Sequence, residues 1–122
     1  DADVLLHALC DALLGAAGMG DIGTQFPDTA AEWKGADSKE LLKLVMIKLT
    51  EAGWSVGNVD STLVMERPKI MPHVPAMRAV IAAILGVGED AVGIKATTNE
   101  KLGFVGREEG ACAHAVALIE RK

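Results

Sequence analysis

The spacing of apolar residues changes between a helical and a strand period several times along the chain. Over residues 1–17 apolar side chains recur every three or four positions, as on the buried face of a helix. Residues 54–65 alternate loosely and are rich in β-branched side chains, which is typical of a strand. The same reasoning predicts further helices over 37–53 and 75–86 and further strands over 92–97 and 112–120. Helices interleaved with strands predict an α/β or α+β sandwich.

Length, composition and charge narrow the class of protein further. A chain of 122 residues suits one domain, spanning 1–122. Half of its residues are apolar but only 3% are aromatic, so the core must be aliphatic. The net charge of −5, without a Lys/Arg-rich stretch, argues against a nucleic-acid partner. No apolar run reaches the roughly 18 residues that a membrane span needs, so no membrane partner is expected.

Two polar connections are too rich in turn formers to predict regular structure. They cover residues 19–36 and 98–110. Long loops in small domains are more often functional than idle. Three strands also make a thin sheet for three helices, and the chain opens on Asp1 rather than Met. We therefore expect further strands before Asp1.

Three polar residues share one face of the first predicted helix. Asp3, His7 and Asp11 follow a spacing of four residues, which places them above one another. Two carboxylates beside an imidazole can bind a divalent cation or orient the histidine. An ordinary solvated helix face explains the same spacing, and metal sites generally need three or four protein ligands.

The connections offer further candidate binding residues, each with a structural alternative. Asp21 and Asp28 stand among glycines and a proline, where backbone can approach a ligand, or where an Asx turn can form. Residues 65–70 directly follow a strand and include Pro68 and Lys69, which suits either a base or phosphate cradle or a plain solvated turn.

The segment 95–110 contains the highest density of residue types that bind phosphates or metals. Adjacent threonines, a carboxylate, a lysine, an arginine and several glycines leave a strand end together. This combination suits a phosphate held by hydroxyls and amides, with Glu100 bringing a metal to it. The chain has no Walker sequence, no dinucleotide glycine fingerprint and no Gly-x-Ser-x-Gly elbow. Ordinary nucleotide hydrolysis and hydrolase chemistry are therefore unsupported.

Five sequence blocks, taken in order, resemble the family of 2-C-methyl-D-erythritol 2,4-cyclodiphosphate synthases. The blocks are DADVLLHALCDALLG (1–15), GDIG-x-x-FPDT (20–29), KGADS (34–38), PKIMPH (68–73) and ATTNEKLGFVGREEG (96–110). The resemblance implies a ferredoxin-like layer, a small mixed sheet packed on helices. It implies a homotrimer with active sites between subunits, in the bacterial cytoplasm, with a plastid as the alternative compartment.

The resemblance also implies a reaction, a phosphorus–oxygen lyase step of the non-mevalonate isoprenoid pathway. Such enzymes cyclise 4-diphosphocytidyl-2-C-methyl-D-erythritol 2-phosphate to the 2,4-cyclodiphosphate and release CMP. His7 is then a Zn²⁺ ligand, Glu100 holds a second divalent cation (Mg²⁺ or Mn²⁺), and Thr98 stabilises the transition state. Phe104 and Arg107 line a cavity that accepts isoprenoid diphosphates. The other implied substrate-binding positions are Asp21, Ile22, Gly23, Phe26, Pro27, Asp28, Thr29, Ala30, Met65, Glu66, Arg67, Pro68, Lys69, Ile70, Met71, Thr97 and Asn99, with Thr98 and Glu100 also in this set.

The chain departs from the family pattern at a few positions. The family's early Asp-x-His pair, which supplies two more zinc ligands, and its His-Ser before the first helix have no counterpart here. Asn99 replaces a threonine, and His114 stands where an acidic residue is common. If nothing precedes Asp1, we expect weak zinc binding and slow turnover. The alternative is a catalytically impaired trimer that binds CMP or isoprenoid diphosphates.

Overall fold

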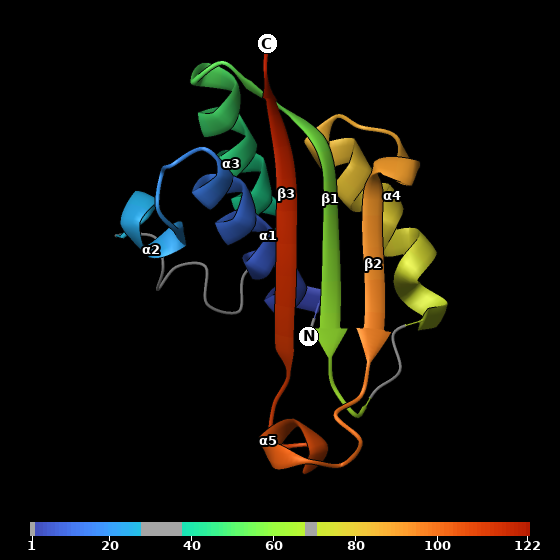
Figure 1. Cartoon of the computed structure of the whole chain (residues 1–122). Coiled ribbons are helices and arrows are strands. Elements are labelled where there is room, and N and C mark those ends of the chain that lie inside the picture. Colours follow the sequence, from blue (N-terminus) through green and yellow to red (C-terminus); the bar gives the residue numbers. More distant parts are fainter. Residues whose placement is uncertain (1, 28–37, 68–70) are drawn as a thin grey trace.

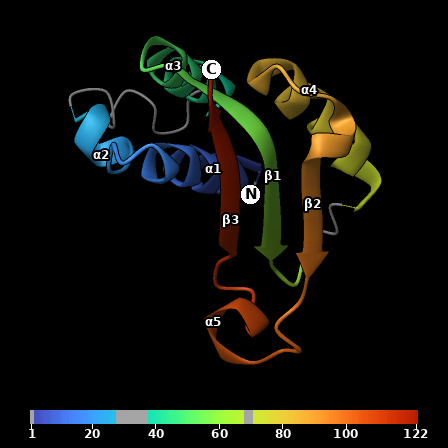
Figure 2. The same cartoon turned by 45° about the horizontal axis from the view of Figure 1, so that its top comes forward.

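A mixed three-stranded sheet forms one layer of the protein (Figures 1 and 2). The computed structural model describes residues 2–27, 38–67 and 71–122. The central strand β1 (Trp54–Val64) pairs in parallel with β2 (Val92–Thr97) and antiparallel with β3 (Cys112–Arg121), giving the order β2-β1-β3. This arrangement confirms the predicted mixed α/β layer.

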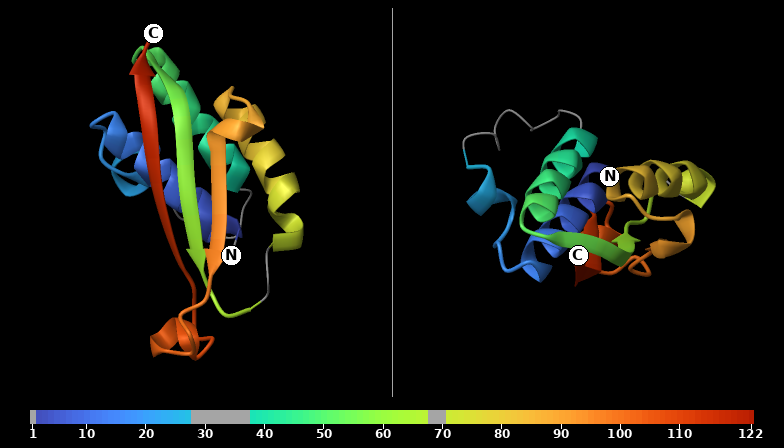
Figure 3. Two further views of the ribbon diagram at one scale, coloured as in Figure 1. Left: turned by 45° about the vertical axis from the view of Figure 1, so that its right-hand side comes forward. Right: turned by 90° about the horizontal axis from the view of Figure 1, so that it is seen from above.

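Three longer helices form the second layer and cover one face of the sheet (Figure 3, right). They are α1 (Ala2–Ala16), α3 (Ser38–Glu51) and α4 (Val74–Leu85). Most leucines of α1 and α3 are buried, and they belong to the same core cluster as Val59 and Leu63 of β1. Burying such a side chain contributes roughly 1.5–3 kcal/mol. The core is aliphatic, as the composition predicts, and its largest fully buried members are Leu5, Leu9, Leu13, Leu14, Leu41, Leu42, Val45, Leu49, Val59, Leu63, Ile81 and Val92.

No helix of the described residues covers the opposite face of the sheet (Figure 3). This face carries both charged and apolar side chains. Asp60 on β1 forms an ion pair with Lys95 on the neighbouring β2. Val116 and Leu118 on β3 are 68% and 59% exposed. Side chains alternate between the two faces of each strand, which explains why the inward neighbour Ser61 is buried. Its hydroxyl donates to the Gly93 carbonyl at 2.9 Å.

The main elements lie where the sequence predicts them, but both polar connections contain short helices. The prediction of irregular structure was wrong for α2 (Ile22–Gln25) and for α5 (Gly103–Gly106). Two 3₁₀ turns, η1 (Met71–His73) and η2 (Glu89–Ala91), were also not predicted. The side-chain cap of Asp21 supports α2, and the left-handed residues Glu100, Lys101 and Gly103 lead into α5; apolar spacing reveals neither feature. The helix predicted over 37–53 starts in the structure at Ser38, and Asp37 lies outside the described residues.

Both cysteines are free. Cys10 is buried within α1, and this burial, with the charge of Asp11, raises the pKa of its thiol to about 12. In the part of the chain that the structure describes, no helix has the length and apolar character to cross a membrane.

Candidate active site

The candidate residues that the structure describes fall into two regions. The helix-turn region comprises His7 on α1 and residues 21–27 around α2. The strand-end region comprises residues 65–67, Met71 and residues 97–110. Figures 1 and 2 show α2 beside α1 and α3, whereas α5 extends beyond the carboxyl ends of β1 and β2. Within one chain the structure therefore does not bring the two sets together.

A carboxylate organises the helix-turn region. Asp21 is the N-cap of α2, and its Oδ1 accepts hydrogen bonds from the Thr24 N–H and hydroxyl, both at 2.8 Å. These bonds, first from the Thr24 backbone and then from its side chain, hold the pKa of Asp21 below its ordinary value. Gly20, at φ +83°, makes the sharp entry that lets the chain reverse before this cap. A short helix therefore forms among residues that individually favour turns.

A second carboxylate attaches α2 to α1. Asp11 Oδ1 accepts from the Ile22 N–H at 2.9 Å, and Gln25 Nε2 donates to the Met19 carbonyl at 2.8 Å. Lys48 of α3 also lies over the Phe26 ring, with Nζ 5.4 Å from the centroid. These contacts hold the predicted substrate positions Ile22 and Phe26 beside α1 and α3, and the predicted positions Gly23 and Pro27 belong to the same short segment. The predicted positions Asp28, Thr29 and Ala30 lie outside the described residues.

The polar face of α1 does not form a metal cluster in the described chain. Asp11 caps α2, and His7 Nε2 lies 3.3 Å from the buried Ser38 hydroxyl. Among residues 2–27, 38–67 and 71–122, no three His, Cys, Asp or Glu side chains could together hold a metal ion. His7 therefore stays a predicted ligand, while the described donors do not form the three- or four-ligand site that zinc requires.

The parallel pairing of β1 and β2 builds the strand-end region. Val64 lies opposite Thr97, and the Met65 N–H donates to the Thr97 carbonyl at 3.0 Å. Beyond the strands, Glu66 Oε2 accepts from the Asn99 N–H at 2.8 Å. The segments after the two strands are therefore adjacent, as their predicted common role in framing one ligand requires. Pro68, Lys69 and Ile70 lie outside the described residues, and Met71 is 59% exposed at the start of η1.

The chain after β2 makes a tight turn through two left-handed residues. Glu100 and Lys101 have φ of 52° and 65°, a conformation that costs roughly 1–2 kcal/mol for a residue with a side chain. The Glu100 N–H lies 3.3 Å from the Thr98 hydroxyl oxygen, and the Leu102 N–H donates to the Asn99 carbonyl at 2.9 Å. Thr98 and Glu100 are both exposed at this turn, so a ligand can reach them.

Helix α5 packs back onto this turn. A Cβ added at Gly106 would lie 2.0 Å from the Lys101 carbonyl carbon, so only glycine fits there. Phe104 is 47% exposed, and Arg107 donates to the Glu109 carboxylate at 3.0 and 3.1 Å. The turn thus places the two predicted cavity residues on the same loop as Thr98 and Glu100.

Sequence reasoning missed the ion pair between Arg67 and Glu108. Arg67 Nε donates to Glu108 Oε1 at 2.7 Å, joining the segment after β1 to the loop after α5. Glu108 has a left-handed φ of 62°. The two partners are 41 positions apart, and no local pattern could have paired them.

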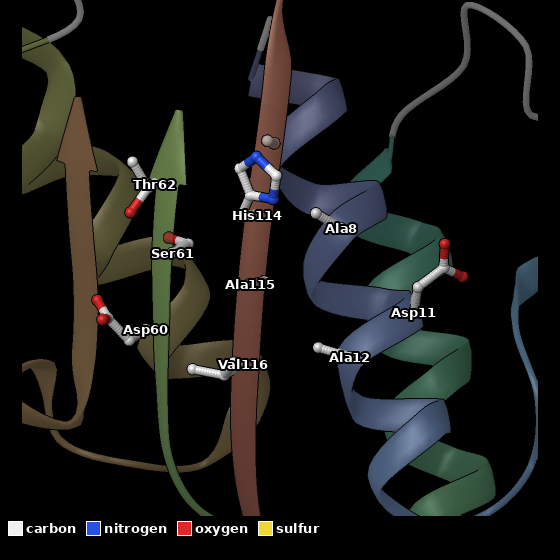
Figure 4. A pocket seen from close by; sticks show the side chains of 10 residues that line it. Ala8, Asp11, Ala12, Asp60, Ser61, Thr62, His114, Ala115 and Val116 are labelled. Atoms are coloured by element: carbon white, nitrogen blue, oxygen red, sulfur yellow. The ribbon is translucent and has the colours of Figure 1, made fainter. Parts of the chain in front are cut away.

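A further hollow lies beside α1, and Asp11, which bonds to the α2 backbone, is among the residues that line it. It has a volume of about 670 Å³ between α1 and β3, and its lining includes Ala8, Ala12, Asp60 and His114 (Figure 4). None of the predicted substrate-binding residues lines it. Small side chains and strand backbone form most of its wall, and Asp60 is already paired with Lys95. We therefore place the candidate site at the two regions and not in this hollow.

The comparisons with known proteins decide the family. A family model described as the YgbB family matches residues 1–120. The chain belongs to the YgbB family. A 2-C-methyl-D-erythritol 2,4-cyclodiphosphate synthase of Thioalkalivibrio sulfidiphilus is 62% identical over 120 residues, covering 98% of this chain and 75% of that protein. The synthase of the same name from Pseudomonas aeruginosa is 60% identical over 119 residues, covering 98% and 76%.

Solved structures of this family have the same fold. The bifunctional IspDF of Campylobacter jejuni matches with a TM-score of 0.91 and 43% identity, covering 98% of this chain and 32% of that one. A CDP complex of the Plasmodium falciparum IspF matches with a TM-score of 0.85 and 28% identity, covering 98% and 71%. Family membership and fold therefore agree.

Proposed function

We propose that the protein is a 2-C-methyl-D-erythritol 2,4-cyclodiphosphate synthase. It cyclises 4-diphosphocytidyl-2-C-methyl-D-erythritol 2-phosphate and releases CMP, as a phosphorus–oxygen lyase of the non-mevalonate pathway. The observation that carries the proposal is the 62% identity to a synthase of that name over 98% of the chain. The same relatives favour an enzyme over the alternative of an impaired trimeric remnant that binds CMP or isoprenoid diphosphates.

The reaction is an intramolecular phosphoryl transfer. An oxygen of the 2-phosphate attacks the β-phosphorus of the diphosphate, the bond from that phosphorus to the CMP oxygen breaks, and CMP leaves with the electron pair. Two anionic groups must be held together, so positioning is the main task of the protein. Well-oriented intramolecular reactions reach effective molarities of roughly 10⁵ M or more.

The strand-end region is proposed to hold the leaving group and the diphosphate. Residues 65–71 with Thr97 and Thr98 would frame the cytosine and the phosphates, and the exposed Thr98 hydroxyl would donate to the charge that develops on the phosphoryl oxygens. Removing one such donor from an active site typically costs about 3–4 kcal/mol of transition-state stabilisation. The CDP complex of the Plasmodium falciparum protein supports a cytidine diphosphate ligand for this fold.

The helix-turn region is proposed to hold the methylerythritol or ribose part of the substrate, through Asp21, Gly23 and the residues that follow. Because this region and the strand-end region lie apart in one chain, we propose a homotrimer in which one subunit supplies each. The exposed Val116 and Leu118 on the open sheet face support burial against another subunit. Phe104 and Arg107 would then line the cavity for isoprenoid diphosphates.

Family membership supports the use of a divalent metal in general, and the individual sites remain predictions. One exposed carboxylate beside substrate phosphates is the donor set that Mg²⁺ commonly uses, with water completing the shell. Glu100 fits this chemistry, and Mg²⁺ or Mn²⁺ there would neutralise diphosphate oxygens. For Zn²⁺ the described residues offer His7 without enough partners, so we assign no step to zinc. The bacterial relatives support the predicted bacterial cytoplasm, with a plastid as the alternative.

The test is a cyclisation assay with added divalent metal, following CMP and the cyclic diphosphate together. We expect both products from the protein, a fall in kcat of about 100-fold or more for Thr98→Ala, and a large loss for Glu100→Gln. Glu51→Gln, an exposed charge at the end of α3, is the matched control and should keep the parent rate. Undiminished activity in both site variants would refute the proposed site. CMP binding without cyclisation by the parent protein would instead support the non-catalytic remnant.

A further inference from the structure

Glu66 makes a contact that its predicted place in the nucleotide pocket does not require. The side chain is half-buried, and its Oε2 accepts from the Asn99 N–H at 2.8 Å. The partners are 33 positions apart, one after β1 and the other after β2. The carboxylate therefore connects the ends of two strands through a backbone donor.

The backbone that Glu66 holds is the one that positions the proposed reacting groups. Asn99 lies between Thr98 and Glu100, and its carbonyl and side chain both bond to Leu102, at 2.9 and 3.1 Å. Glu100 and Lys101 follow in the left-handed conformation, which surrounding contacts must maintain. A charged acceptor forms stronger hydrogen bonds than a neutral one, so the Glu66 carboxylate is suited to anchor this turn.

The neighbouring ion pair is a weaker connection. Arg67 is 81% exposed and its partner Glu108 is 48% exposed, so water and salt screen their attraction. The contact from Glu66 to Asn99 ends on a backbone group next to Thr98, whereas the Arg67 contact ends on a side chain beyond α5. Glu66 is therefore the better candidate for controlling the turn.

We propose that Glu66 is a positioning residue that holds residues 98–101 in the geometry of the reaction. The catalytic consequence of this inference rests on the proposed synthase function. The hydrogen bond between Glu66 and the Asn99 N–H forms without substrate. By fixing the Asn99 N–H, the carboxylate sets where the Thr98 hydroxyl lies before substrate binds. Misplacing a catalytic group by about 1 Å can lower a rate on the order of 100-fold.

The experiment compares Glu66→Ala, Glu66→Gln and the control Glu51→Ala. In Glu66→Ala we expect kcat to fall about 10- to 100-fold, with KM changing much less. Glu66→Gln should recover most of the rate, because its amide oxygen can still accept from Asn99. Amide hydrogen exchange at Asn99, measured by NMR without substrate, should be about ten-fold faster in Glu66→Ala and close to the parent rate in the other two variants.

The possible outcomes distinguish the structural role of Glu66 from the proposed synthase activity. Unchanged Asn99 exchange in Glu66→Ala overturns the inference, as does a Glu66→Ala effect confined to KM, because the carboxylate would then contact substrate directly. A Glu66→Gln variant as slow as Glu66→Ala, with Asn99 exchange restored, also overturns it. If the parent protein makes no cyclic product, the proposed function fails, while the exchange measurement still decides whether Glu66 holds the turn.

Discussion

The two regions of the candidate site use the same residue types but are stabilised over different distances along the chain. In the helix-turn region, Asp21 accepts from the Thr24 N–H three residues on, and Asp11 accepts from the Ile22 N–H eleven residues on. In the strand-end region, Glu66 and Asn99 are 33 residues apart, and Arg67 and Glu108 are 41 apart. The α2 turn can therefore form or fray locally, although His7 and Phe26 of the same region also contact Ser38 and Lys48 of α3. The strand-end region depends on the pairing of the sheet.

Substitution of Gly106 should have the largest effect on stability and activity of all the changes considered. The structural change should be confined to the strand-end region. A Cβ there would overlap the Lys101 backbone, so Gly106→Ala must displace α5 or the turn at 98–101. Such overpacking typically costs about 1–3 kcal/mol, and we expect a lower melting temperature with activity reduced by at least the Thr98→Ala effect. Thermal unfolding and the cyclisation assay measure both.

Gly15→Ala is the matched control for this substitution. Gly15 lies within α1, and nothing comes within 4 Å of an added Cβ. Alanine in a helix should stabilise the protein by roughly 0.5–1 kcal/mol. Equal destabilisation by both substitutions would show that the close approach of Gly106 to Lys101 is not what requires glycine.

Removal of the α2 cap should act locally. Asp21→Ala removes the acceptor of both Thr24 hydrogen bonds, so we expect amide exchange at Thr24 to rise about ten-fold while the melting temperature changes little. Asp21→Asn keeps a good capping group and should preserve slow exchange. A large fall in global stability in Asp21→Ala would contradict the local character of this region.

Acid should weaken the Asp21 cap of α2 only below the ordinary titration range of an aspartate. The folded pKa of Asp21 is lowered by the hydrogen bonds from Thr24, so its contribution is complete above the unfolded pKa, about 3.9. That contribution is lost as the pH falls through the lower, folded pKa. NMR titration should show the Thr24 amide shifting below about pH 3.9, and this step should disappear in Asp21→Asn. A midpoint above the ordinary value would contradict the lowered pKa.

The sequence predicted the layers well because apolar spacing reports which face of an element is buried. Leu5, Leu9 and Leu13 reveal α1, and the alternation around Val59 and Leu63 reveals β1. The family resemblance implied that residues 65–67 and 97–100 both belong to the substrate site, and the parallel pairing of β1 with β2 is what places these segments side by side. The sequence did not predict α2 or α5, because their formation depends on the Asp21 cap and on left-handed turns at Glu100, Lys101 and Gly103.

The sequence also does not reveal which charged residues bind a ligand and which make contacts within the fold. Asp11 appeared to belong with Asp3 and His7 on one helix face, but its carboxylate bonds to the α2 backbone. Glu108 lay in the segment 95–110 but was not among the predicted site residues, yet it pairs with Arg67. Both assignments depend on contacts between segments whose relative placement no local pattern encodes.

The smallest predicted effect concerns the ion pair between Arg67 and Glu108. It tests whether this pair contributes less to the strand-end region than the hydrogen bond between Glu66 and Asn99. Because Arg67 and Glu108 are largely exposed, a double-mutant cycle with Arg67→Ala and Glu108→Gln should give a coupling of only about 0.2–1 kcal/mol in unfolding free energy. Added salt should reduce it further. Asn99 exchange should stay slow in the Arg67 variant, since Glu66 still holds the turn. A salt-insensitive coupling well above 1 kcal/mol would instead make this pair, and not Glu66, the main connection between the loops.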